Sequence, residues 1–135
     1  MRIMAVDYGD RHTGIAVSDI LGMIAGEAWT VDDWNPETLA DKIALEVKNR
    51  DVGTIVLGYP LNMDGSAGPR AEKSLEFSKL LFEKTGLKPV MWDERLTTVD
   101  AHRILSDNDR LGKRRKKTVD AVAATLILEG YLGSR

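Results

Sequence analysis

Short apolar runs and helical repeats of apolar residues alternate along the chain. The strand-like runs are unbroken or nearly unbroken apolar stretches, at residues 3–6, 14–18, 24–31, 54–57 and 90–92. Apolar residues recurring at helical spacing follow in four stretches, which begin near Pro36, Pro69, Thr97 and Thr118. The predicted order is therefore three strands, then helix, strand, helix, strand and two helices.

Residues at the ends of these stretches predict where the helices begin and end. Asn35 before Pro36 indicates a helix start, because Asn accepts hydrogen bonds from free amides and Pro has no amide to satisfy. Gly86 is the residue type expected just after a helix. Thr97 opens a capping box, and Thr118 predicts the start of the last helix, which makes the basic residues before it a loop.

This order of elements predicts an α/β fold with a mixed five-stranded sheet and helices on both faces. A length of 135 residues suits one domain over residues 1–135. We expect neither a membrane span nor a secretory signal, because no apolar stretch is long enough and the amino terminus reads as a buried strand. The lack of cysteine excludes disulfides, thiolate metal sites and cysteine nucleophiles.

Charge is nearly balanced over the whole chain, with 19 basic and 21 acidic residues. Its distribution is uneven, because six of the eight residues at 110–117 are basic and the rest of the chain is net acidic. Such a run is often only a solvated loop, but a polyanion bound to this one would lie next to Asp120. We therefore predict nucleic-acid binding by Lys113, Arg114, Arg115, Lys116 and Lys117.

Three acidic residues occupy positions where a site can form. Asp7 and Glu94 follow predicted strands, and Asp120 lies in the first turn of the last helix. Each could be an ordinary turn or helix-start acid, but the carboxyl ends of parallel strands gather at one edge of a sheet. Clustered carboxylates repel one another and favour a bound Mg²⁺ or Mn²⁺, and a pair of such ions can hydrolyse a phosphodiester. We predict that Asp7, Glu94 and Asp120 are catalytic and metal-binding.

The loop at residues 58–68 combines glycines with short polar side chains, so its free amides could hold a phosphate. It lacks the ending of a P-loop, and a tight structural turn explains it equally well. Asn62 and Arg70 are the best candidates there for contacting a substrate. The tryptophans form no aromatic platform interleaved along the sequence for stacking bases, and we interpret them as packing residues.

Four segments resemble the YqgF/RuvX family of Holliday junction resolvases, also described as pre-16S rRNA nucleases. They read DYGDRHTGIAVSD at 7–19, GYPLNMDG at 58–65, WDERLTT at 92–98 and KTVDAVAA at 117–124. The resemblance spans essentially the whole chain and implies an RNase H-like nuclease domain with a divalent-metal centre in a cytoplasmic bacterial protein. Carried over by position, its acids are again Asp7, Glu94 and Asp120. We also expect Arg11 and Arg95, within these segments, to contact the nucleic acid.

The resemblance leaves two nucleic acids open as the substrate. Processing the 5′ end of pre-16S rRNA needs one active site and can involve a ribosomal particle, whereas resolving a four-way DNA junction needs a homodimer with two sites. We favour the RNA, with a monomer or a homodimer as the functional unit and no membrane as a partner. A module that binds nucleic acid without cutting it is the main alternative, and an actin-like phosphotransferase of two such domains is a weaker one.

Overall fold

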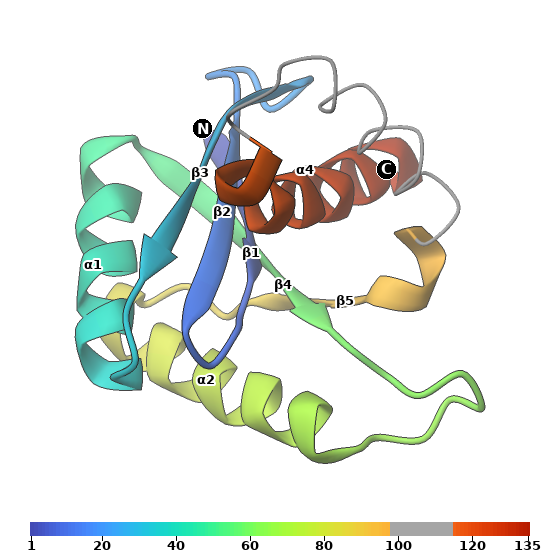
Figure 1. Ribbon diagram of the computed structural model, residues 1–135. Coiled ribbons are helices and arrows are strands. Elements are labelled where there is room, and N and C mark those ends of the chain that lie inside the picture. Colours follow the sequence, from blue (N-terminus) through green and yellow to red (C-terminus); the bar gives the residue numbers. More distant parts are fainter. Residues whose placement is uncertain (98–114) are drawn as a thin grey trace.

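The structure, a computed structural model, describes residues 1–97 and 115–135 (Figure 1). Its sheet has five strands in the order β3-β2-β1-β4-β5. The strands are β1 (Arg2–Asp7), β2 (His12–Ser18), β3 (Ala25–Asp32), β4 (Val52–Tyr59) and β5 (Val90–Asp93). β2 runs antiparallel to both β1 and β3, whereas β4 is parallel to both β1 and β5. The predicted meander and the mixed sheet are confirmed.

Helices cover both faces of this sheet, as predicted (Figure 1). They are α1 (Pro36–Asn49), α2 (Pro69–Thr85) and α4 (Arg115–Ser134), with the short 3₁₀ helix η1 (Glu94–Thr97) after β5. α1 and α2 pack together on one face and α4 packs on the other. None of the described helices has both the length and the apolar character needed to cross a membrane.

The central strand β1 is buried on both sides, which explains its unbroken apolar run. Successive side chains of a strand point to opposite faces. Met4 and Val6 accordingly join the core under α1 and α2, whereas Ile3 and Ala5 join the core under α4. Beyond this run, Asp7 faces α4 like Ile3 and Ala5. The next residue, Tyr8, faces α1 and α2 like Met4 and Val6. The end of β1 therefore supplies one side chain to each face.

The capping residues act largely as the sequence indicates. The Asn35 side chain accepts a hydrogen bond from the amide of Glu37 at 2.9 Å, and Gly86 ends α2 in the left-handed conformation with a φ of 75°. The start of the last helix was predicted wrongly, because α4 begins at Arg115 and not at Thr118. Lysine and arginine are good helix formers, so the basic residues extend the helix backwards. The helix predicted after Thr97 lies outside the described residues.

A close approach between the backbones of α4 and β2 sets how near α4 lies to the sheet. A Cβ atom built on Gly14 would lie 1.9 Å from the carbonyl oxygen of Asp120. Gly14 is also the residue that pairs with Asp7 across the β1–β2 ladder. Because Gly14 has no side chain, the backbone of α4 packs directly against β2 beside the end of β1. This contact brings Asp120 next to Asp7.

We expect Gly14→Ala to lower the free energy of unfolding by about 2 kcal/mol or more, because the new methyl group would meet backbone that cannot rotate away. It should also impair any activity that depends on Asp120. Gly133→Ala is the matched control, since a Cβ there meets nothing within 4 Å. Urea unfolding should show the control unchanged or more stable by up to about 1 kcal/mol. Equal stability of the two variants would contradict this reading of Gly14.

Candidate active site

The three predicted acids lie at the edge of the sheet where β1, β4 and β5 end. Asp7 is the last residue of β1, and Glu94 directly follows β5. Their side chains are hydrogen-bonded to each other. Asp120 approaches from α4, and its carboxylate is near enough to raise the pKa of Asp7. The structure thus brings together all three residues chosen from the sequence.

Gly58 of β4 makes the meeting of Asp7 and Glu94 possible. Strand β4 lies between β1 and β5, so a side chain on it would separate the two acids. A Cβ atom on Gly58 would lie 3.0 Å from the carboxyl carbon of Glu94 and 2.8 Å from the Cδ1 atom of Ile127. The Glu94 side chain therefore extends over bare backbone toward Asp7.

The acids perturb one another strongly. Burial, followed by the carboxylates of Glu94 and Asp120, raises the pKa of Asp7 from 3.8 to about 8, against the lowering effect of the Arg70 guanidinium. Burial also raises the pKa of Glu94, although the hydrogen bond with Asp7 and the charge of Arg70 act the other way. The shared hydrogen bond thus favours protonated Asp7 donating to ionised Glu94. With a pKa of about 8, Asp7 keeps its proton at neutral pH.

The donor set suits a divalent cation that binds through oxygen. Within residues 1–97 and 115–135, no three His, Cys, Asp or Glu side chains stand close enough together to enclose an ion as they are. Asp7 and Glu94 hold a proton between them, with Asp120 nearby. Carboxylate oxygens are the ligands that Mg²⁺ and Mn²⁺ prefer, and a double positive charge would remove the repulsion that keeps the proton in place. The residues therefore fit such an ion.

Positive charge reaches this edge from the start of α2. Arg70 is the second residue of α2, and its guanidinium lowers the pKa of both Asp7 and Glu94. A cation near enough to act on these carboxylates favours their ionised form and would also attract a phosphate. The position of Arg70 therefore agrees with the substrate contact expected from the sequence, which stays a prediction.

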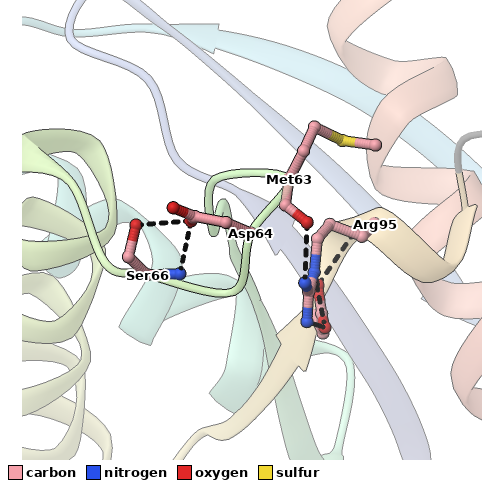
Figure 2. A network of polar contacts seen from close by, with 5 residues as sticks. Met63, Asp64, Ser66 and Arg95 are labelled. Carbon is pink, nitrogen blue, oxygen red and sulfur yellow. Dashed lines mark hydrogen bonds and ion pairs between the residues drawn. The ribbon is translucent and has the colours of Figure 1, made fainter.

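Arg95 holds the loop between β4 and α2, as Figure 2 shows. Its Nη2 atom donates to the Asp93 carboxylate at 2.6 Å, and its Nη1 atom donates to the Met63 carbonyl oxygen at 3.4 Å. In the same loop the Asp64 carboxylate accepts hydrogen bonds from the amide and the hydroxyl of Ser66, at 2.9 and 2.6 Å. Arg95 therefore acts within the protein, and its contact with nucleic acid stays a prediction.

The other predicted nucleic-acid contacts are placed in part. Asn62 also braces the loop, since its Nδ2 atom donates to the Ser66 hydroxyl at 3.0 Å, and the Arg11 guanidinium stacks on the Trp34 ring at 4.2 Å from its centroid. The backbone of Arg115, Lys116 and Lys117 forms the first turn of α4, directly ahead of Asp120, whereas Lys113 and Arg114 lie outside the described residues. Their binding to nucleic acid stays a prediction.

Sequence reasoning missed Gly14 and Gly58 as determinants of the site. Gly14 begins the apolar run of β2 and Gly58 ends that of β4, and a glycine inside a strand is a known sign of close backbone approach. The identity of the approaching partner could not be read from that sign. It depends on α4 and η1, which come from the far end of the sequence.

Comparisons with known proteins agree with this architecture. The family model described as "RuvX: Holliday junction resolvase" matches residues 1–134. Two relatives named "Putative pre-16S rRNA nuclease" come from Carboxydothermus hydrogenoformans and Halothermothrix orenii. The first is 42% identical, over 98% of this chain and 96% of the relative. The second is 46% identical, over 98% of this chain and 94% of the relative.

A solved structure supports the fold. T. thermophilus RuvC, in complex with a Holliday junction substrate, aligns with a TM-score of 0.64 at 12% identity, over 99% of this chain and 96% of that one. The fold is accordingly RNase H-like, as the sequence resemblance implies. Because the family model and the relatives both cover nearly the whole chain, the protein belongs to the RuvX family of Holliday junction resolvases.

Proposed function

We propose that this protein is a divalent-metal-dependent endonuclease that hydrolyses phosphodiester bonds in a nucleic acid. The arrangement of Asp7, Glu94 and Asp120 carries the proposal, because a buried carboxyl pair that shares one proton beside a third acid is unfavourable for folding alone. Relatives that align over nearly their whole length are named as nucleases, which supports the same activity.

We assign Asp7, Glu94 and Asp120 as the ligands of Mg²⁺ or Mn²⁺ at this edge. When bound, a pair of such ions activates a water molecule and stabilises the oxygen that leaves phosphorus. Asp7 releases its shared proton to solvent, so that all three carboxylates can act as oxygen ligands. Asp7 would be a ligand shared with both other acids, since both act on its carboxyl group, and Glu94 would also orient the attacking water.

Cleavage at this site is a hydrolysis. The water oxygen loses a proton to solvent as it forms a bond to phosphorus, the bond from phosphorus to the leaving nucleoside oxygen breaks, and that oxygen takes up a proton from solvent. Arg70 offsets the repulsion between the phosphate and the acids, because its guanidinium lies close to both Asp7 and Glu94. The basic residues that open α4 hold the flanking backbone of the strand.

The substrate we propose is the precursor of 16S rRNA, cut at its 5′ end in the cytoplasm, with a ribosomal particle as partner. The names of the two relatives support this choice. A four-way DNA junction is the second candidate, and the family description favours it. Symmetric cuts in two opposed strands require two copies of the site, and hence a homodimer.

Cleavage of both labelled substrates tests the proposal. Pre-16S rRNA, alone and within a ribosomal particle, and a four-way DNA junction are each incubated with Mg²⁺, Mn²⁺ or a chelator. We expect cutting that needs the metal, at the RNA 5′ end. Symmetric cuts in the junction would support the nuclease activity but identify the DNA junction as its substrate. Binding without any cut, weakened by salt and by charge reversal at the start of α4, would establish the non-catalytic module instead.

A further inference from the structure

A groove lies at the same edge of the sheet as the acids, but on the face covered by α1 and α2. Its volume is about 540 Å³, which is within the range of small-ligand sites. We call it the aromatic groove, and it is lined by Tyr8, Asp10, Trp34, Pro36, Lys73, Glu76, Phe77 and Leu80. These residues come from the turn after β1, from the segment that leads into α1 with its first residue, and from α2.

Aromatic rings form the walls of this groove. Tyr8 stacks on the buried Phe77, with ring centroids 4.1 Å apart and planes 6° from parallel. This contact fixes the Tyr8 ring against the core. Trp34 is 69% exposed, and the Arg11 guanidinium covers one part of its ring at 4.2 Å. A large aromatic surface thus remains open to a flat ligand beside a positive charge.

Polar groups stand at the rim. The Lys73 ammonium pairs with the Asp10 carboxylate at 3.2 Å, and both side chains are largely exposed. Both also act on the Tyr8 hydroxyl, whose pKa is raised by burial and by Asp10 and lowered by Lys73. A ligand with a flat ring and exocyclic hydrogen-bonding groups matches this combination.

The groove is one residue away from the proposed active site. Asp7 faces α4 with the other acids, and Tyr8 faces α2, because neighbouring residues alternate across the strand. Arg70 and Lys73 are three residues apart in the first two turns of α2, on one side of the helix. Arg70 acts on the acids, and Lys73, which is paired with Asp10, lies at the groove, so the start of α2 connects the two places.

We propose that the aromatic groove binds one unpaired nucleobase of the strand that is cut, next to the scissile phosphate. The inference rests on the proposed function, since the acids define where that phosphate lies. The base stacks on Trp34 and the Tyr8 ring, and Arg11 and Lys73 hold its backbone phosphate. A base within a duplex cannot enter, because both of its faces are already stacked. The groove thus selects single-stranded or frayed nucleic acid at the cleavage position.

A second hollow in the described residues lacks these features. It measures about 650 Å³ and lies between the later parts of α1 and α2, beside the start of β4. Its lining, which includes Lys48 and Lys84, contains no aromatic side chain. It therefore offers no stacking surface, although it is the larger of the two.

The test follows the fluorescence of 2-aminopurine, a fluorescent base analogue, placed at one position of a short single-stranded RNA. Binding is measured in a chelator, so that nothing is cut, for wild type, Trp34→Ala, Trp34→Phe and Phe82→Ala. Phe82 is the matched control, because it is a half-exposed aromatic residue at the other end of α2. Substitution of the exposed Trp34 leaves the core intact, and Trp34→Phe keeps a stacking ring.

We expect quenching in wild type, Trp34→Phe and Phe82→Ala, with its loss and about tenfold weaker binding in Trp34→Ala. Binding without quenching, or equal binding by Trp34→Ala and Phe82→Ala, would overturn the inference. The cleavage assay separates it from the proposed function. If wild type cuts but shows no quenching, the groove assignment fails alone. Quenching without cutting would support the groove assignment and contradict the proposed nuclease activity. Absence of both quenching and cutting would contradict both proposals.

Discussion

We expect Asp7→Asn to stabilise the metal-free protein at pH 7 by an amount on the order of a few kcal/mol. In the wild type the folded chain must either keep a proton on Asp7 or hold ionised carboxylates together in a buried place. Asparagine keeps the size and the hydrogen-bonding capacity of a protonated aspartic acid and carries no charge. The variant therefore lacks the unfavourable free energy of protonating Asp7, or of burying its charge, that the metal-free wild type has.

The effect has a definite pH window. The pKa of Asp7 is raised from 3.8 to about 8, so between these values the folded state binds a proton that the unfolded state has lost. Wild-type stability therefore falls as pH rises through this window, and burial of Glu94 adds to the fall. Below pH 3.8 the variant and the wild type should be alike with respect to this group, and their difference is largest above pH 8.

Urea unfolding in a chelator at pH 5 and pH 8 measures this difference. Asp41→Asn is the matched control, because it makes the same chemical change at an exposed carboxylate whose partner is Lys84, on the helix surface. We expect it to change stability by less than about 1 kcal/mol at both pH values. A destabilised Asp7→Asn protein, or a gap that does not widen with pH, would show that Asp7 is an ordinary structural acid.

We expect Glu94→Gln and Asp120→Asn each to slow metal-dependent cleavage by about a hundredfold or more, because each removes a charged oxygen ligand. Both variants should also need more Mn²⁺ for half-maximal activity. Removal of a negative charge brings no penalty to the binding of a polyanion, so substrate affinity in a chelator should stay the same or rise.

Initial cleavage rates over a range of Mn²⁺ concentrations provide the measurement, and filter binding in a chelator provides the affinity. Asp41→Asn again serves as the control and should cut like wild type. Loss of cleavage together with loss of binding would assign Glu94 and Asp120 to substrate contact. Full activity in either variant would remove that residue from the site.

The order of the elements along the chain and the gathering of the three acids at one edge were predictable because their signals are local. The apolar run before Asp7 marks a buried strand, the run before Glu94 marks a partly buried edge strand, and parallel strands end at a common edge. Asn35 and Gly86 act through their own side chain or backbone conformation, so their roles follow from the residue type. Such features need no knowledge of distant parts of the chain.

The remaining features depend on contacts between distant segments. The groove unites Tyr8, Trp34 and Phe77, which no spacing rule connects in the sequence. Gly14 is required because of the backbone at Asp120, and this neighbour is set by how α4 crosses the sheet. The start of α4 was misplaced because a capping threonine at position 118 competes with a preceding run of good helix formers. Tertiary packing decides all three cases.

Cleavage by Asp7→Asn in the presence of Mg²⁺ tests the role of the acids most directly. The substrate is whichever nucleic acid the wild type cuts, and unfolding is measured on the same preparation. We expect no metal-dependent cleavage from a variant that is at least as stable as wild type, so that unfolding cannot explain the loss. Metal-dependent cleavage at the wild-type rate by Asp7→Asn would contradict the assignment of this carboxylate edge as the active site.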